Sequence, residues 1–345
     1  MKFKLKRKPS LRNLLWKIPL TVTEYRMLGL LLIGSLFFSM PGRWCAAQFE
    51  IAATVDGQPV NVKRLQLQVG LVLKKTPAEG LKLKIIQAQV LEENIKQRLV
   101  FIYLQGSQHK ASQAEIDAQS SNLETELIEQ KSNLKQYLQK RDISEAQLRD
   151  SLAWDICWSK YLATYLTDQN LKKYFDQHRR KFDGTQLRVA HVLFQPEDEA
   201  DPKSWKTAFA KATSVLADLQ NEKIDFEQAV IQYSSGATKI NHGELGWITW
   251  RGPMAPEFTI ASFKLKTGEF SQPVQTSFGF HLINLLEEKP GKIKMEDIRP
   301  QVVQGVKRYL FDWLATKQAK QTKVEFTGNY PFFKPGTKTL GKSAE

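Results

Sequence analysis

The chain has 345 residues, 42% of them hydrophobic, and carries a net charge of +14. These values are ordinary for a globular protein of about two domains with a sizeable core. Its two cysteines exclude a disulfide framework. The positive charge forms no patch interleaved with aromatic residues, which argues against nucleic acid as a partner. It is better explained by solvated helix faces, and secondly by attraction to acidic clients or to a membrane surface.

Residues 1–47 are typical of a targeting segment, with nine basic residues and one acidic residue. The apolar run over 27–40 has 14 uncharged residues, fewer than the ~20 that span a bilayer comfortably. Residues 45–47, Cys-Ala-Ala, place small side chains three positions and one position before a cleavage point ahead of Gln48. This pattern favours a cleaved signal peptide and an extracytoplasmic location, periplasmic or secreted. An uncleaved N-terminal membrane anchor is the alternative, because Arg43 is unusual so near a cleavage site.

Residues 48–183 are predicted to be helical after a short β-hairpin. An Asp-Gly turn at 56–57 between two apolar runs predicts the hairpin. Apolar side chains then recur at three- and four-residue steps, as in helices that bury one face. Ser112 followed three residues later by Glu115 is typical of a helix start. Cys157 lies in an apolar helical pattern, so we expect a buried structural thiol.

At Gly184 the pattern changes to short strands and helices, which is typical of an α+β domain built on a small sheet. We expect this domain to end at residue 290. Strands are predicted at 187–195, 244–247 and 280–287, and helices at 204–220, 225–233 and 257–264.

Residues 291–326 contain one more predicted helix, over 293–320. Its apolar stripe needs a partner, so we expect it to pack on the N-terminal helices and to complete their domain. Residues 327–345 are rich in Gly, Pro and Lys and are predicted to be disordered.

Five motifs between residues 184 and 290 carry a resemblance to a known family. They are a strand with His191, GELGW at 243–247, GPMAPEF at 252–258, GEFSQPV at 268–274 and FGFHLI at 278–283. In this order they resemble a parvulin-type peptidyl-prolyl cis/trans isomerase domain. More degenerate motifs, such as the hairpin at 55–60, resemble the helical chaperone domain of SurA-like and PrsA-like foldases. The resemblance implies an α+β fold: a helical chaperone domain completed by a C-terminal helix, plus a four-stranded antiparallel sheet with surrounding helices.

The resemblance also implies a site. His191 and His281 are expected to hydrogen-bond to one another at the floor of an apolar cup, with Thr276 beside them, and to be catalytic together with it. Because one proton suffices between two buried rings, we expect both imidazoles to be neutral with fixed tautomers. No Cys, Asp or Glu lies near either histidine at ligand spacing, so neither a metal nor another cofactor is expected. The cup that binds the proline ring consists of Leu245, Met254, Phe258 and Phe278.

The chemistry that such a site must perform is modest. An X-Pro bond prefers trans only slightly, but its C–N double-bond character creates a barrier of ~18–20 kcal/mol to rotation. No covalent bond has to break. A catalyst needs only to bind the twisted amide better than either planar form, which an apolar cup beside fixed polar groups can do.

One departure from the family leaves two functions open. The loop at 235–242 contains neither an acid nor a thiol, whereas the family usually has Asp or Cys at the position of Ser235 or Gly236. The first function is an exported foldase that binds unfolded or nascent exported proteins and isomerises their X-Pro bonds. The alternative is a holdase chaperone whose parvulin domain binds clients with little or no isomerase activity. The oligomeric state is not predicted.

Overall fold

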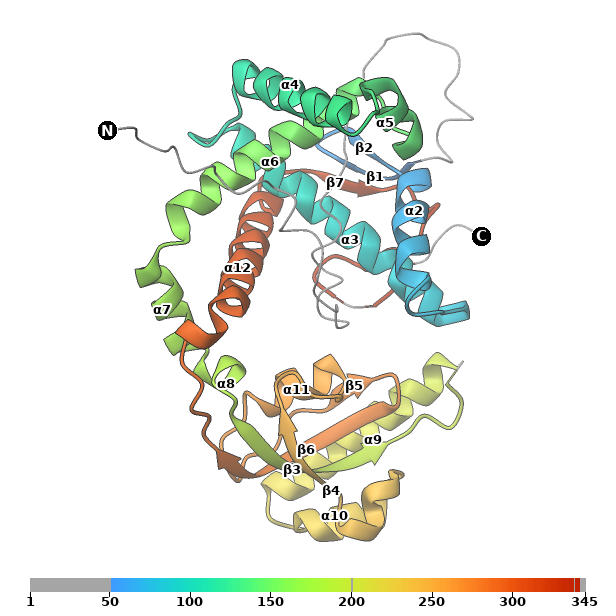
Figure 1. Cartoon of the computed structure of the whole chain (residues 1–345). Coiled ribbons are helices and arrows are strands. Elements are labelled where there is room, and N and C mark those ends of the chain that lie inside the picture. The colour runs from blue at the N-terminus through green and yellow to red at the C-terminus, as the bar shows by residue number, and fades with distance from the viewer. Residues whose placement is uncertain (1–50, 200, 338, 342–345) are drawn as a thin grey trace, which may run out of the picture. The chain divides into compact units, whose positions relative to one another are not determined.

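The computed structural model describes residues 51–199, 201–337 and 339–341. The expected targeting segment, residues 1–47, lies outside them. The described residues form two compact units (Figure 1): residues 51–164 with 309–341, and residues 165–308. No helix among these residues is long and apolar enough to cross a membrane.

The first unit is mostly helical and contains a three-stranded antiparallel sheet in the order β2-β1-β7. The turn between β1 and β2 has positive φ at Asp56 and Gly57 (53° and 73°), the conformation that two-residue hairpins favour. The expected hairpin therefore forms. The elements are β1 (Ile51–Val55), β2 (Gln58–Asn61), α2 (Val62–Leu73), α3 (Gly80–Gln105), α4 (Gln113–Glu129), α5 (Leu134–Arg141), α6 (Glu145–Tyr165) and β7 (Val324–Phe326).

The C-terminal segment completes this unit, as the sequence predicted. Residues 309–319 of helix α12 (Arg299–Ala319) belong to this unit. Phe311 meets the indole rings of Trp154 and Trp158 edge to face, at centroid distances of 6.4 and 6.1 Å. Strand β7 then pairs with β1, so two segments that lie far apart in the sequence share one sheet.

The prediction of a disordered tail over 327–345 differs from the structure for residues 327–337 and 339–341. Tyr330 is 3% exposed in the core formed with β1 and α3. Phe332 stacks on Phe326 at 4.4 Å, and the Thr327 hydroxyl donates to the carbonyl of Ile51 at 2.6 Å. The Gly, Pro and Lys content was misleading because Tyr330 and Phe332 anchor this segment to the core and to Phe326.

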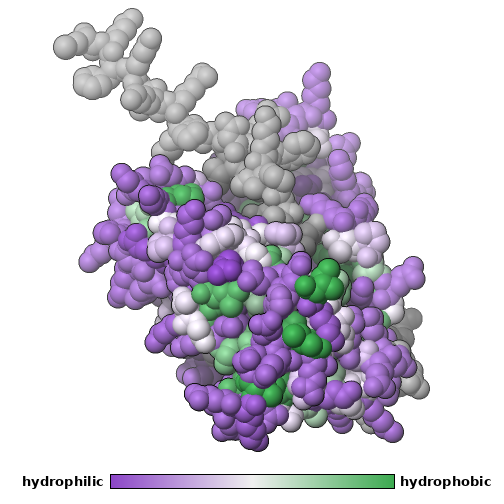
Figure 2. All heavy atoms as spheres, turned by 90° about the horizontal axis from the view of Figure 1, so that it is seen from below, coloured by the Kyte–Doolittle hydropathy of each residue, from purple (hydrophilic) through white to green (hydrophobic). Residues whose placement is uncertain are grey.

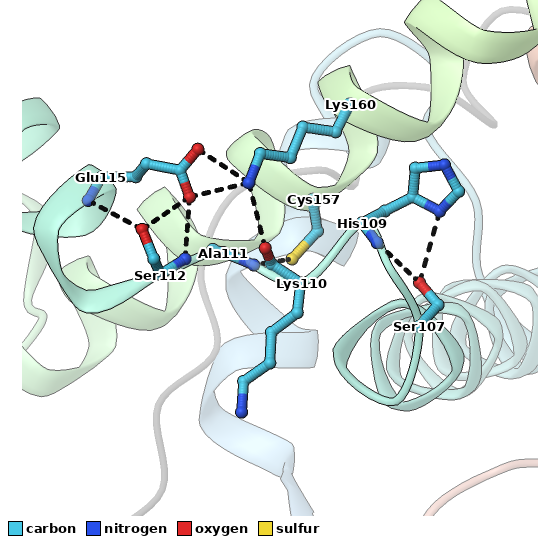
Figure 3. Close-up of polar contacts among 8 residues, drawn as sticks. All are labelled: Ser107, His109, Lys110, Ala111, Ser112, Glu115, Cys157 and Lys160. Atoms are coloured by element: carbon cyan, nitrogen blue, oxygen red, sulfur yellow. Dashed lines mark hydrogen bonds and ion pairs between the residues drawn. The ribbon is translucent and has the colours of Figure 1, made fainter.

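The connection between α3 and α4 is clamped onto α6 by polar contacts (Figure 3). Ser112 and Glu115 form the expected capping box. The bond from Lys160 to Glu115, at 2.7 Å, and two bonds from Ser112 lower the pKa of Glu115 to about 2. Cys157 is fully buried and its Sγ accepts the N–H of Ala111 at 3.2 Å, while burial raises the pKa of the thiol. The prediction of a structural thiol is confirmed.

The second unit contains a four-stranded antiparallel sheet in the order β4-β3-β6-β5, which confirms the expected fold class. The sequence located three of these strands, and β5 is the fourth. The elements are α7 (Asp168–Gln177), α8 (Arg179–Phe182), β3 (Gln186–Phe194), α9 (Pro202–Gln220), α10 (Phe226–Tyr233), the 3₁₀ helix η4 (Ala237–Asn241), β4 (Glu244–Thr249), α11 (Pro256–Ser262), β5 (Val274–Thr276), β6 (Gly279–Lys289) and the 3₁₀ helix η5 (Glu296–Ile298).

Two apolar cores cover the two faces of this sheet. On one face, Val192 and Leu282 pack with α9 and α10. On the other, Val189 and Ile283 pack with Phe258 of α11. Successive side chains of a strand point to opposite faces. The odd-numbered residues of β3 and β6 therefore share the α11 face, and His191 and His281 are among them.

Candidate active site

The strand register brings the two histidines together. In the antiparallel pair of β3 and β6, His191 lies opposite Ile283, and His281 lies opposite Leu193. The two histidines are therefore diagonal neighbours on one face, within reach of one another's side chains. Their Nδ1 atoms are 2.9 Å apart, and the rings are nearly parallel, with an interplanar angle of 16°.

The outer nitrogen of each ring is bonded to a threonine. Thr276 Oγ1 lies 2.8 Å from Nε2 of His281, as the resemblance implied. Thr238 Oγ1 lies 2.9 Å from Nε2 of His191. The N–H of Phe278 donates to Thr276 Oγ1 at 3.1 Å. Four side chains thus form one continuous hydrogen-bonded row.

Burial keeps both rings neutral. Each is 6% exposed. Desolvation lowers the pKa of His191 from 6.5 to about 4. Desolvation, and then the proximity of His191, lowers the pKa of His281 to about 4. A low-dielectric surrounding disfavours the charged imidazolium, so both imidazoles are neutral at pH 7, as expected. They present fixed dipoles rather than charges.

Apolar side chains pack next to the histidines. Phe258 is 3% exposed and meets both rings edge-on, with centroids 5.9 Å from His191 and 5.3 Å from His281. Met254 and Leu245 are partly buried against the same cluster. Phe278, by contrast, is 61% exposed. Three of the four expected cup residues therefore share one apolar cluster, whereas Phe278 is exposed and is not part of it.

Gly243 is required directly beside His191. Its φ is +78°, and a Cβ there would lie 2.5 Å from the carbonyl oxygen of His191. The N–H of His191 donates to the Gly243 carbonyl at 2.9 Å. Only a residue without a side chain allows this approach. The glycine that begins the GELGW motif thus fixes the backbone that carries His191.

Sequence reasoning missed Thr238. Ser235, one of the two positions at which the family usually has Asp or Cys, is exposed and contacts the sheet through its N–H, which donates to Leu193 O at 2.8 Å. Gly236 faces the site instead, since a Cβ on it would lie 3.5 Å from His191 Nε2. The hydroxyl pattern of the loop was the available signal, but the 3₁₀ turn that directs Thr238 inward was not predicted.

Comparison with known proteins identifies this domain. Residues 191–287 match the family model described as Rotamase: PPIC-type PPIASE domain. The chain carries a parvulin-type peptidyl-prolyl isomerase domain. The match spans both histidines and the whole row between them, and it confirms the enzyme class that the five motifs predicted, a peptidyl-prolyl cis/trans isomerase.

Relatives extend this similarity beyond the parvulin domain. The foldase protein PrsA of Caldanaerobacter subterraneus subsp. tengcongensis is 28% identical over 272 residues, 74% of this chain and 79% of that protein. PrsA of Bacillus subtilis is 28% identical over 276 residues, 79% of each chain. The chaperone SurA of Alcanivorax borkumensis is 24% identical over 79% of this chain and 65% of that protein. These matches confirm a PrsA- and SurA-like architecture.

Among solved structures, the crystal structure of PrsA from Bacillus anthracis matches 67% of this chain and 96% of that chain. The identity is 21% and the TM-score is 0.33.

Proposed function

We propose that the chain is an exported foldase that binds unfolded protein segments and isomerises the X-Pro bonds in them. The observation that carries this proposal is the pair of buried, neutral, hydrogen-bonded histidines next to the apolar cluster of Phe258. In the proposal His191, His281 and Thr276 are catalytic, and Leu245, Met254, Phe258 and Phe278 bind the substrate.

The proposed mechanism needs no nucleophile and no charge. The apolar cluster holds the proline ring, while the amide carbonyl side of the substrate rotates. The histidine row is rigid because each outer nitrogen is held by a threonine, so its dipoles need no reorganisation as the amide twists. Neutral rings also avoid drawing water into the site. The barrier falls because the twisted amide is bound better than either planar form.

Exposed apolar side chains support binding of unfolded segments. Ile240 is 85% exposed, Phe278 61% and Ile231 54%. Figure 2 shows apolar patches separated by hydrophilic surface. Such side chains can bury apolar residues that an unfolded segment exposes to water. The partner that we propose is an unfolded or nascent exported protein.

Export is supported by the basic and apolar composition of residues 1–47. We expect a cleaved signal peptide, with a mature N-terminus at Gln48 in the extracytoplasmic fraction, and an N-terminal anchor as the alternative. N-terminal sequencing of protein recovered from the cell envelope discriminates the two, and recovery of intact protein from the cytoplasm alone would refute export.

The test of catalysis uses residues 48–345 and an Ala-Pro peptide. We expect the protein to accelerate cis-to-trans exchange above the spontaneous rate. Met254→Ala removes an unbranched apolar side chain from the cup and is expected to lower kcat/KM by about tenfold, the effect of ~1.4 kcal/mol of lost contact. Ile260→Ala is the matched control, because Ile260 is 43% exposed on helix α11, which begins two residues after Met254. A wild-type rate equal to the uncatalysed rate would refute the enzyme.

Gly236 favours a second candidate function. It faces His191 without a side chain, where the family usually carries Asp or Cys. The alternative is therefore a holdase that binds clients with little or no isomerase activity. Suppression of aggregation of an unfolded client, measured beside the peptide assay, separates the two functions: a holdase suppresses aggregation without accelerating exchange.

A further inference from the structure

A cavity of about 170 Å³ lies in the second unit, next to the end of β4, and it contains neither the histidines nor the cup residues. Its walls come from α8, from the residues that follow β4 and from the start of α12. All of them belong to residues 165–308. The volume suits a group of about the size of one side chain. The lining residues that matter below are Arg180, Lys181, Trp250, Arg251, Ile293 and Gln301.

The charge of this cavity is positive and only partly matched. Arg180, Lys181 and Arg251 line it, and the described lining residues include no acid. Arg180 already has partners: its Nε pairs with Glu288 at 3.0 Å, and its Nη1 donates to two backbone carbonyls at 3.0 and 3.1 Å. Lys181 and Arg251, by contrast, form no ion pair with another residue that the structure describes. The cavity therefore favours an anionic group.

Two buried polar atoms of the lining residues have no hydrogen-bond partner within the described part of the chain. They are Nη2 of Arg180 and Oε1 of Gln301. Leaving such atoms unmatched is unfavourable. One is a charged donor and the other is a neutral acceptor. A peptide segment with an acidic side chain offers the complement of both, because its carboxylate accepts hydrogen bonds and its backbone N–H donates one.

Lys181 and Trp250 form the wall that an acidic side chain would meet. The Nζ atom of Lys181 lies 4.8 Å from the centre of the Trp250 ring. Burial, and then the charge of Lys264, lowers the pKa of Lys181. A lysine whose charge is disfavoured in this way is stabilised by a nearby carboxylate. The indole ring and Ile293 offer apolar contact to the methylene groups of the same ligand.

Backbone and hydroxyl contacts hold the walls in place. The N–H of Ile293 donates to the carbonyl of Asp183 at 2.9 Å. The N–H of Gly291 donates to Thr185 Oγ1 at 3.1 Å, and the Thr185 hydroxyl donates to the carboxylate of Asp183 at 2.6 Å. Asp183 is only 3% exposed, and the same carboxylate oxygen accepts the Thr185 N–H. A site that is fixed before its ligand arrives loses less entropy on binding.

We propose that this cavity is a subsite that binds an acidic side chain of an extended client segment. Lys181 and Arg251 pair with the carboxylate, and Nη2 of Arg180 adds a hydrogen bond to it. Oε1 of Gln301 accepts a backbone N–H of the segment. The role of the segment as a client rests on the proposed function, whereas recognition of the carboxylate does not.

The cavity and the histidine pair lie within reach of one extended segment. Thr249, which lines the cavity, is paired with Gln186 at the start of β3. His191 is five residues further along that strand, or ~16 Å at ~3.3 Å per residue. Trp250 also packs in the apolar cluster that contains Met254 and Phe258. A client with an acid about five residues from its proline is therefore long enough to occupy both sites.

NMR titration of residues 48–345 tests the subsite. The probes are two short peptides of Ala and Ser, without proline, that differ only in a central Glu or Gln. We expect the Glu peptide, and not the Gln peptide, to shift the Trp250 indole N–H signal, which is assigned by its loss in Trp250→Phe. Lys181→Gln and Arg251→Gln should each weaken binding of the Glu peptide by about tenfold, the effect of one charged hydrogen bond.

Lys206→Gln is the matched control for loss of a positive charge. Lys206 is exposed on α9, which covers the opposite face of the sheet, so this variant should bind the Glu peptide as the wild type does. Sodium acetate at the concentration of the peptide distinguishes a free anion from a segment of a protein. We expect acetate to give a smaller shift than the Glu peptide, because it has no backbone N–H for Gln301.

Equal shifts with the Glu and Gln peptides would overturn the proposal, and this comparison needs only the wild type if a variant does not fold. Wild-type affinity in the Lys181→Gln/Arg251→Gln double variant would overturn it as well. If acetate alone gives the full shift, the cavity is an anion site and the client subsite is refuted. A Trp250 shift specific to the Glu peptide, in a protein that does not accelerate Ala-Pro exchange, would refute the enzyme and support the subsite.

Discussion

The two buried histidines make the parvulin unit sensitive to acid. In the folded protein the pKa of each is about 4, whereas an unfolded histidine titrates near ~6.5. Between these values the unfolded chain binds protons that the folded chain does not. Stability must therefore fall as the pH falls, starting below the unfolded pKa and levelling off near the folded pKa.

The magnitude follows from the two pKa values. At pH 5.0 an unfolded histidine is almost fully protonated, while a folded one with a pKa of about 4 is mostly neutral. This difference costs ~2 kcal/mol per histidine relative to pH 7.5, or ~4 kcal/mol for the pair. A loss of this size is a large part of the ~5–15 kcal/mol that stabilises an ordinary domain.

Urea unfolding of residues 48–345, followed by NMR signals of β3 and β6 at pH 7.5 and pH 5.0, measures this loss. His242→Gln is the control. The side chain of His242 is 63% exposed and pairs with Glu227, so its removal should leave the change with pH almost intact. Equal stability at the two pH values, or ring signals of His191 and His281 that titrate near pH 6.5, would show that the pair is not held neutral by burial.

Two glycines beside His191 give opposite predictions. Gly243→Ala places a Cβ 2.5 Å from the His191 carbonyl oxygen at a φ of +78°, so thermal unfolding should show a loss of at least ~2 kcal/mol; an unchanged midpoint would refute the close approach. In Gly236→Cys the new Cβ lies 3.5 Å from its nearest neighbours, and the φ of −77° suits any residue. The free energy of unfolding should therefore change by less than ~1 kcal/mol. We expect the added thiol to raise isomerase activity, and a lower activity would contradict a role for a polar group there.

Local hydrogen bonds made much of the helical unit predictable. The capping box of Ser112 and the turn at 56–57 form as expected because their partners lie within three residues. The strands that the sequence did not reveal are three residues long: β5 and β7. Strands so short have no measurable alternation, and each exists only because a neighbouring strand, β6 or β1, offers it a paired edge.

The candidate site, too, could be predicted only in part from the sequence. Strand alternation alone cannot place His191 beside His281, because it gives the face but not the register. The register of β3 on β6 includes a shift between Arg188 and Val189, and such an irregularity leaves no clear mark in one sequence. The order of the five motifs, through the resemblance to the parvulin family, indicated instead that the two histidines lie together. Thr238 was missed because its contact depends on the direction of a five-residue turn.

The same turn explains how a loop without an acid can serve this site. A carboxylate facing His191 would favour the imidazolium and raise the pKa of the pair, because a nearby negative charge stabilises the charged ring. The Thr238 hydroxyl makes a hydrogen bond of 2.9 Å to the same nitrogen without adding charge. Desolvation then remains the main effect, and the pKa values stay at about 4. A loop that meets His191 with a hydroxyl and without a carboxylate therefore keeps the histidines neutral over a wider range of pH.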